Sequence, residues 1–400
     1  MSTLNHDTSV LVIGGGYSGA LAANRLRKRP EVRVTLINPR PMFVERVRLH
    51  QLVAGTAAAI VDYRRILAPP VDLVVDTVTR IDPSGRGVLL ASGRTLPYDR
   101  LIYAVGSTGE PPASVAGARE HALSVAEFES AQRARAALDV LPADAPITVI
   151  GGGLTGIETA TELAGTGRSV TLVCAEGLSP YLSDRVRRHI ARWMSRHGVV
   201  VLERQRVVEV RRTAVVLADG TVRASALTLW TAGFGVPTLA ADSGLRTDAV
   251  GRLLTDETLT SLDDDRIVAT GDAAAPSGRP LRMSRQAAGP LGAQAADTVL
   301  SRIAGTEPRA IDLALTGACV SLGRRAAVRQ FAHKDDVAMD GCLSGGLGVA
   351  YKELSTRVAV GKIRLEARRP GSVPWPRGGR RPETVDAGDI ALVRASGVTS

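Results

Sequence analysis

Long apolar runs, aromatic side chains and paired cysteines are all scarce in this 400-residue chain. Glycines and charged residues interrupt every apolar stretch before it reaches the ~18 to 20 residues that a membrane-spanning helix needs, so we expect no transmembrane segment. Residues 1–8 lack a basic region followed by an apolar stretch, which predicts a cytoplasmic protein without a secretory signal. The length allows two to three domains.

Aromatic residues make up only 3% of the chain, although 50 basic and 40 acidic residues leave a net charge of +10. Nucleic-acid-binding surfaces usually combine basic side chains with aromatic platforms for the bases. Here the basic residues are nearly all Arg and are spread along the chain, so we predict solvated surface and no nucleic-acid partner. An Arg-, Pro- and Gly-rich cluster at 368–382 predicts an extended or mobile tail. Such a tail could contact anionic lipid as a peripheral membrane interaction, but we favour a tail that binds nothing.

The cysteines are Cys174, Cys319 and Cys342, and they form neither a CxxC nor a CxxxxC pair. This spacing argues against disulfide reduction by an internal dithiol. Cys174 lies in an apolar run and is interpreted as a small buried hydrophobe. Cys319 and Cys342 remain open as a pair that could act together in space. No metal ligands are assigned.

Two nearly identical glycine-rich segments stand out, VIGGGYSG at 12–19 and VIGGGLTG at 149–156. Each follows an apolar run and opens an alanine-rich helical stretch. In this context the first glycine allows a tight turn, the second lets the backbone approach a pyrophosphate, and the third allows close packing of helix and strand. The helix N-terminus supplies free N–H groups for the anion. The pair therefore predicts two dinucleotides bound by one chain.

A third element, RIVATGDAAA at 266–275, is expected to be a short strand that ends in Gly271-Asp272. An aspartate at a strand end can accept hydrogen bonds from polyol hydroxyls, and small residues after it let a diphosphate approach the backbone. The segment YDRLIYAVG at 98–106 lies between the two glycine motifs, and LWTAG at 229–233 lies between the second motif and this element. The order of these motifs over roughly residues 8–305 resembles the two-dinucleotide-binding-domain flavoproteins of the glutathione reductase type.

The resemblance implies an α/β fold with two Rossmann-like dinucleotide-binding domains, the second inserted in the first. The implied FAD-binding domain combines 1–110 and 251–310, the NAD(P)H-binding domain spans 111–250, a region at 311–365 covers the flavin or forms a homodimer face, and 366–400 is the tail. The residues expected to hold FAD are Gly14, Gly15, Gly16, Tyr17, Ser18, Gly19, Asn38, Val78, Ala104, Gly106, Gly271 and Asp272. Those expected to hold the nicotinamide nucleotide are Gly151, Gly153, Gly156, Glu176 and Gly233.

Two positions bear on the ribose groups. Glu176 follows Gly156 by 20 residues, near the spacing expected for a ligand of the ribose 2′-hydroxyl, where an NADP-dependent enzyme should have Arg. We therefore expect NADH rather than NADPH. Asn38 stands where family members that bind FAD usually have an acid, and an amide can still bond a ribose hydroxyl. Disulfide reductases of this fold carry their cysteines in the following stretch, 38–54, which here has none.

Residues 153–164 (GLTGIETATELA) resemble the Thr-Gly-x-Glu segment of type II NADH:quinone dehydrogenases. The resemblance places Glu158 in the first helical turn, close to the nicotinamide, where a carboxylate could orient the ring for hydride transfer. The alternative is a charge that complements the helix dipole. Gln286 matches the first glutamine of the helix that lies beneath the isoalloxazine in those enzymes, but the second glutamine is replaced by Pro290.

The segment 39–52 is expected to run along the flavin. His50 could bond the isoalloxazine or relay a proton, because histidine ordinarily titrates near neutrality. The alternative is a partly exposed helix histidine. Arg46 and Arg48 could pair with phosphate or remain solvated.

The resemblance thus implies an FAD-dependent oxidoreductase that takes hydride from NADH and passes electrons to a small-molecule acceptor, with a quinone as one candidate. Pro290 and the lack of apolar amphipathic helices at the C-terminus keep two alternatives open. One is a soluble flavoenzyme that tailors a specialised metabolite. The other is a redox-responsive NADH-binding flavoprotein with little turnover.

Overall fold

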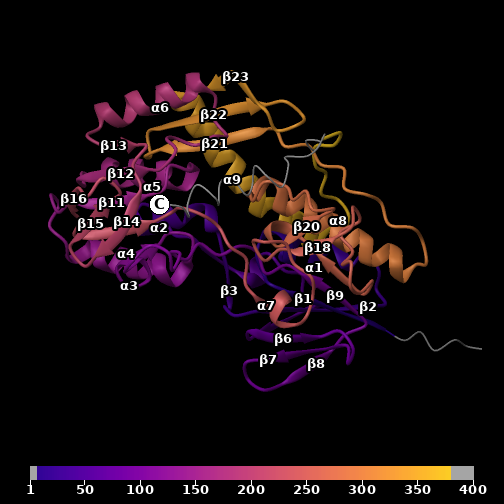
Figure 1. The fold of residues 1–400 in the computed structure, drawn as a ribbon. Helices are drawn as coiled ribbons and strands as arrows, with labels where there is room; N and C mark the ends of the chain where they lie inside the picture. Colours follow the sequence, from indigo (N-terminus) through magenta and orange to yellow (C-terminus); the bar gives the residue numbers. More distant parts are fainter. Residues whose placement is uncertain (1–6, 380–400) are drawn as a thin grey trace, which may run out of the picture.

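Two five-stranded parallel sheets with the same internal layout form the framework of the chain, of which the computed structural model describes residues 7–379 (Figure 1). The first sheet has the order β19-β9-β1-β2-β5, with bounds Ile267–Ala269, Arg100–Tyr103, Thr8–Ile13, Val32–Asn38 and Val71–Val75. The second has the order β10-β17-β11-β12-β13, with bounds Ala122–Ser124, Leu227–Trp230, Ile147–Ile150, Val170–Cys174 and Val200–Glu203. The predicted α/β class is confirmed.

The second sheet is inserted in the chain of the first. All its strands come from residues 122–230, between β9 and β19, and β19 then returns to pair with β9 in the register Ile267↔Leu101. Strand β1 pairs in parallel with β2 on one side and with β9 on the other. The carboxyl ends of these strands therefore meet at one edge of the first sheet, where ligands bind in open α/β folds.

Helices cover both sheets, as buried parallel strands require. On the first sheet, α1 (Tyr17–Leu26) packs against α8 (Arg285–Ile303), and a Cβ on Gly292 would lie 2.3 Å from the Ser18 carbonyl oxygen. Glycine at position 292 thus permits the close approach of the two helices. The main helices of the second sheet are α4 (Phe128–Val140), α5 (Leu154–Gly165) and α6 (Asp184–Arg196).

The short helix α2 (Leu49–Ala54) links the two halves. It comes from the first part of the chain, yet it packs against α4 and α5. Its apolar residues Leu49 and Val53 are buried in the same core as the strands of the second sheet. This crossing brings the α2 side chains to helix α5 of the second half.

Two antiparallel ribbons have equivalent places in the two halves. The first is β6-β7-β8 (Val78–Asp82, Gly87–Leu90, Thr95–Pro97), and the second is β14-β15-β16 (Val207–Arg211, Ala214–Leu217, Val222–Ala224). Each ribbon follows the edge strand of a parallel sheet along the chain, β5 in the first half and β13 in the second.

The C-terminal unit consists of the antiparallel sheet β21-β22-β23 (Gly317–Leu322, Ala326–Ala332, Ala338–Leu343) and the helix α9 (Gly345–Arg368). Helix α9 packs on β22 and β21 and extends to α1 (Figure 1). Two-stranded pairs and short helices complete the described elements: β3 (Met42–Val44) with β4 (Ile60–Asp62), β18 (Leu253–Thr255) with β20 (Ala274–Pro276), α3 (Ala118–His121), α7 (Leu239–Asp242), η1 (Arg46–Arg48), η2 (Tyr63–Arg65) and η3 (Gly271–Ala273).

A tail was expected from residue 366, but the chain there is still part of a helix and then contacts neighbouring elements. Helix α9 continues to Arg368, and the chain after it is bonded to neighbouring elements. Val373 N donates to Glu366 Oε2 at 2.9 Å, and Trp375 Nε1 donates to the Asp312 carbonyl at 2.9 Å. The end of the predicted basic cluster, 380–382, lies outside the described residues.

Within residues 7–379, none of the helices combines the length and the apolar character needed to cross a bilayer.

Candidate functional site

The residues expected to hold FAD lie around the carboxyl edge of the first sheet. Gly14 follows β1, Asn38 ends β2, Ala104 follows β9 and Gly271 follows β19. These four strands are neighbours in one parallel sheet, so their ends and the loops after them converge. Val78 is different, because it opens the ribbon strand β6 and its side chain is buried in the core of this half.

The first glycine loop has a backbone that only glycine accommodates. Gly14 has φ +100°, and a Cβ there would lie 2.3 Å from the Ala104 carbonyl oxygen. A Cβ on Gly19 would lie 1.8 Å from the Gly14 carbonyl oxygen, so α1 packs directly on the loop. Gly16 is the N-cap of α1, and a Cβ on it would meet no described atom within 4 Å. The helix N-terminus thus opens onto free space, where its N–H groups can bind a pyrophosphate.

Two side chains hold this loop from behind. Asn38 Oδ1 accepts from Gly15 N at 2.9 Å, and its Nδ2 donates to the Arg40 carbonyl at 2.8 Å. The Tyr63 hydroxyl donates to the Gly15 carbonyl at 2.8 Å. The sequence did not single out Tyr63. Asn38 therefore supports the loop, and one amide hydrogen and one lone pair remain for the predicted ribose contact.

The predicted ribityl ligand Asp272 belongs to a short polar chain. Its Oδ2 accepts from Ser107 Oγ at 2.8 Å, and Arg46 Nη1 donates to the Ser107 carbonyl at 2.6 Å. Arg46 thus pairs with the loop after β9. Gly106 and Gly271, on either side of this chain, have φ +73° and +68°.

The other two residues of the first motif pack around the start of α1. The Tyr17 ring meets Phe43 edge to face with centroids 5.0 Å apart. Ser18 Oγ donates to the Ala288 carbonyl of α8 at 2.8 Å.

The second glycine loop repeats the first. Gly151 has φ +118°, and a Cβ on Gly156 would lie 1.8 Å from the Gly151 carbonyl oxygen. Gly153 is the N-cap of α5, and a Cβ there would meet no described atom within 4 Å. Glu176, two residues after β12, is exposed, and Gly233 follows β17 with φ +72°. These positions also meet at one sheet edge, because β17, β11 and β12 are neighbours.

Glu158 lies at the point where the two halves and the C-terminal unit meet. It is the fifth residue of α5, in its second turn rather than the first turn that was expected. Oε1 accepts from Ser321 N at 2.9 Å and from Ser321 Oγ at 3.0 Å, and it forms an ion pair with Lys352 Nζ of α9. The side chains of Glu158 and Lys352 are 10% and 13% exposed, so the pair is buried.

This environment keeps Glu158 ionised. Burial alone would raise the pKa of the carboxyl, but the Lys352 ammonium, His50 and the Ser321 hydrogen bonds together lower it. Oε2 accepts no hydrogen bond from residues 7–379, and His50 Nδ1 lies 4.0 Å from it. One carboxylate oxygen of an anionic residue therefore remains available for a ligand.

His50 is buried rather than partly exposed, with a relative exposure of 2%. Its Nε2 lies 3.4 Å from Ser321 Oγ. Burial lowers the pKa of His50 to about 4, which outweighs the opposite effect of Glu158. The premise that this histidine titrates near neutrality is wrong, and the ring is neutral at physiological pH.

Further ion pairs tie the same junction together. Arg48 of η1 pairs with Glu45 at 3.5 Å and with Glu353 of α9 at 3.2 Å. Arg324 pairs with Glu353 at 3.2 Å and approaches Glu162 of α5 at 4.0 Å. The sequence left two alternatives for Arg48, a phosphate contact or a solvated side chain. In the structure Arg48 instead pairs with two carboxylates.

Gln286 lies in the first turn of α8, which Ser284 caps by accepting from Ala287 N at 3.3 Å. The Gln286 amide is oriented so that its oxygen and its nitrogen are both hydrogen-bonded. The oxygen accepts from Thr316 N at 2.9 Å, and the nitrogen donates to the Gly317 carbonyl at 3.1 Å. The side chain thereby anchors α8 to the start of β21. Pro290 lies one turn further along the same helix.

The cysteines do not form a reactive pair. Cys319 lies opposite Arg329, and Cys342 lies opposite the next residue, Gln330. Since successive strand residues point to opposite faces, the two thiols lie on opposite faces of the sheet. All three cysteines are free, and burial raises the pKa of Cys174 to about 12, which makes it an inert core residue.

Two parallel sheets with matched glycine loops and uncapped helix N-termini define a protein with two dinucleotide sites. Comparison with known proteins agrees. The family described as pyridine nucleotide-disulphide oxidoreductase matches residues 8–296, and the chain belongs to this family. It is an FAD-dependent NAD(P)H oxidoreductase resembling the NADH dehydrogenase-like members.

Two relatives and one solved structure illustrate the similarity. The NADH dehydrogenase-like protein Rv1812c of Mycobacterium tuberculosis is 31% identical over 296 residues, which cover 67% of this chain and 73% of that protein. The NADH dehydrogenase-like protein YutJ of Bacillus subtilis is 26% identical over 275 residues, which cover 66% and 76%. The structure of NDH2 from Plasmodium falciparum in complex with NADH superposes with a TM-score of 0.76 at 15% identity, covering 90% of this chain and 97% of that chain.

Proposed function

We propose that this chain transfers hydride equivalents from NADH to FAD and then electrons to a small-molecule acceptor. The observation that carries the proposal is the pair of glycine loops, each with a left-handed first glycine and a helix N-terminus that opens onto free space. In the proposed arrangement the domain formed by 1–110 and 251–310 binds FAD, and 111–250 binds NADH. When bound, FAD supplies the chemistry that accepts a hydride and releases its electrons singly or in pairs.

The first loop would hold the FAD pyrophosphate at the N-terminus of α1. Asp272 and Ser107 lie on the adjoining loops, where the Ser107 hydroxyl donates to the Asp272 carboxylate. These groups fit the ribityl hydroxyls, which need acceptors as well as donors. Asp272→Ala is expected to lower flavin content, because a charged acceptor is worth roughly 1.5 to 3 kcal/mol.

The second loop would hold NADH. The exposed carboxylate of Glu176 follows the neighbouring strand, where it can accept from the adenosine ribose and repel a 2′-phosphate. This repulsion is the basis for proposing NADH over NADPH.

Glu158 would position the nicotinamide. Its anionic form is maintained by Lys352 and Ser321, while Oε2 is left to accept from the carboxamide N–H of the nucleotide. The role is one of orientation, since a carboxyl whose pKa is lowered does not donate a proton. His50, neutral and buried behind it, would support Ser321 rather than carry protons.

The start of α8 would face the acceptor. A quinone is the candidate that follows from the resemblance to type II NADH:quinone dehydrogenases. The Gln286 amide is hydrogen-bonded to Thr316 and Gly317 at the start of β21, so it would shape this site by fixing the position of that strand. Pro290, which lacks a side-chain donor, would be the position that separates this chain from its quinone-reducing relatives.

The test is to measure the two half-reactions separately by rapid mixing under anaerobic conditions. Glu158→Gln should slow flavin reduction by NADH and leave reoxidation by a quinone unchanged, because a substitution affects only the transition state that it touches. Glu162→Gln is the matched control, a second carboxylate one turn along α5 that bonds Thr56. The positioning role is wrong if Glu158→Gln stays within about twofold of the parent, or if both variants slow reduction equally.

Pro290→Gln tests the acceptor side in the same assay. It should alter the reoxidation step and leave reduction by NADH at the parent rate. A change in NADH reduction alone would place the acceptor site elsewhere.

A further inference from the structure

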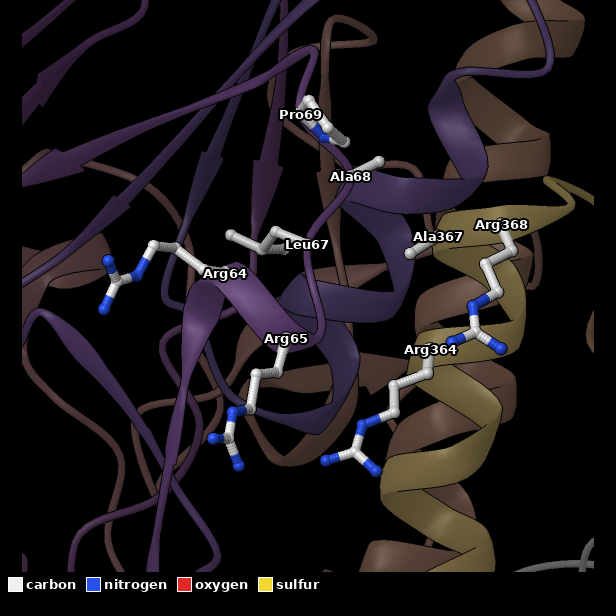
Figure 2. A pocket seen from close by; sticks show the side chains of 8 residues that line it. All are labelled: Arg64, Arg65, Leu67, Ala68, Pro69, Arg364, Ala367 and Arg368. Atoms are coloured by element: carbon white, nitrogen blue, oxygen red, sulfur yellow. The ribbon is translucent and has the colours of Figure 1, made fainter.

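An arginine-lined cavity of about 480 Å³ lies between the segment after β4 and the C-terminal part of α9 (Figure 2). It is separate from both glycine loops. Its lining residues are four arginines, Arg64, Arg65, Arg364 and Arg368, and four small or apolar residues, Leu67, Ala68, Pro69 and Ala367. Arginines from two distant parts of the chain therefore share one cavity.

The positive charge of this cavity is largely uncompensated. None of its lining residues carries a carboxylate, within the part of the chain that the structure describes. Arg64 pairs with Asp62 at 2.6 Å and extends away from α9. Arg65, Arg364 and Arg368 form no ion pair within residues 7–379. The Arg364 side chain extends from α9 into the space between the two walls, and the Arg65 side chain points away from α9 at the edge of the cavity (Figure 2). Like charges gathered in this way favour binding of an anion.

The two walls are held at a fixed separation by a buried residue of α1. Asn24 is fully buried, and its Nδ2 donates to the Ile66 carbonyl at 2.8 Å and to the Ile363 carbonyl of α9 at 3.2 Å. Its Oδ1 accepts from Ala68 N at 3.0 Å. Arg27 also donates to the Ala367 carbonyl at 2.8 Å. The cavity is thus built in advance, so a ligand does not have to order its walls.

The cavity cannot be the pyrophosphate site of the first loop. Asn24, which binds both walls, lies eight residues beyond Gly16 along α1, or roughly 12 Å at 1.5 Å per residue. The pyrophosphate would lie beside Gly16, at the N-terminus of α1. A ligand in the cavity would be an additional one.

We propose that this cavity is a second anion site, which binds a phosphate group carried by a small organic molecule or a lipid. Guanidinium groups are planar forks that bind phosphate oxygens in pairs. A phosphate offers three or more such oxygens and can be bound by more than one guanidinium at once, whereas a carboxylate offers two. The apolar floor and the volume leave room for the carbon part of the ligand.

Binding is tested by calorimetry on the FAD-bound protein saturated with NAD⁺, so that both glycine loops are occupied. Inorganic pyrophosphate is the soluble probe, and vesicles of phosphatidylcholine with or without phosphatidic acid are the lipid probe. Arg364→Gln/Arg368→Gln should weaken binding roughly tenfold or more, as expected for the loss of two charge-assisted contacts. Arg65→Gln, on the other wall, should weaken it independently.

The matched control is Arg192→Gln/Arg357→Gln, which removes the same charge at exposed positions outside the cavity, one of them on α9. It should bind within about twofold of the parent. Pyrophosphate binding that is lost only in the cavity variants identifies a soluble ligand, and binding only to phosphatidic acid vesicles identifies a lipid headgroup. The proposal is overturned if neither probe binds, or if cavity and control variants weaken binding equally.

Discussion

The two glycine loops have the same backbone but different surroundings. Each has a left-handed first glycine, at +100° and +118°, and a third glycine packed on the first. Behind the first loop, Asn38 and Tyr63 both bond Gly15 from buried positions. After the corresponding strand of the second loop, the side chain at the ribose position is the exposed Glu176. The side chain at the ribose position is therefore buried behind the first loop and exposed beside the second.

The helices that follow the loops are also anchored differently. Helix α1 packs against α8 through a glycine contact at Gly292, whereas α5 is tied to the C-terminal unit by the buried pair Glu158–Lys352. Under the proposed function, the first loop would hold FAD as a resident cofactor and the second would hold NADH as an exchanging nucleotide. The two loops share one backbone conformation, while the side chains and helices around them differ.

The strongest way to separate the loops is to block them one at a time. A Cβ at Gly19 or Gly156 would lie 1.8 Å from a backbone oxygen, so either substitution by Ala must displace its loop. Gly19→Ala should abolish flavin binding, and the purified protein should be colourless. Gly156→Ala should remain yellow but should no longer be reduced by NADH.

The control for these substitutions is Gly361→Ala in α9, where the new Cβ would meet no described atom within 4 Å. It should keep both activities and gain up to about 1 kcal/mol of stability, because alanine favours helix. A yellow Gly19→Ala protein would show that the first loop does not hold the flavin.

The buried ion pair that anchors α5 can be broken from one side. Lys352→Met leaves the Glu158 carboxylate buried without its cation, which should cost about 3 to 5 kcal/mol of unfolding free energy. Lys352→Met/Glu158→Gln should cost less than Lys352→Met alone, because no charge is stranded. Urea unfolding of the FAD-bound proteins measures both. A loss below about 1 kcal/mol for Lys352→Met would mean that the pair does not anchor the helix.

His50 should make the α5 side of the molecule sensitive to acid. Its pKa is about 4 in the folded protein, against 6.5 for an ordinary solvated histidine, so the unfolded chain binds more protons between these pH values. Stability should therefore fall as the pH drops through this window. Between pH 7 and pH 5 the parent should lose about 2 kcal/mol more than His50→Gln. Equal losses in the two proteins would show that the histidine is not buried in its neutral form.

The smallest expected effect concerns nucleotide choice at the second loop. NADH should reduce the flavin roughly tenfold or more faster than NADPH, about 1.4 kcal/mol. Glu176→Ala should remove most of this preference by raising the NADPH rate. Equal use of both nucleotides by the parent would mean that the Glu176 carboxylate does not contact the ribose.

Much of this architecture could be predicted from local patterns. The glycine loops and the turn at Gly271 after β19 carry their own geometry, because their first glycines have a left-handed backbone and the flanking periodicity defines strand and helix. Contacts between distant segments have no such signature. Nothing in the residues around Lys352 or Ser321 marks them as partners of Glu158, and nothing around His50 marks α2 as packing on the other half.

Two corrections have the same origin. Cys319 and Cys342 belong to the same three-stranded sheet but lie on opposite faces, which depends on the register of β22 between them. The pKa of His50 depends on burial by elements from the other half of the chain. Register and long-range burial are properties of the assembled structure, so a sequence motif does not contain them.

The central claim is most directly tested by titrating the purified protein with NADH in the absence of oxygen while the flavin absorbance is recorded. The account predicts a yellow protein whose flavin is bleached by one equivalent of NADH and regains its colour when a quinone is added. A protein that neither contains nor takes up FAD, or whose flavin stays oxidised in excess NADH, would contradict it.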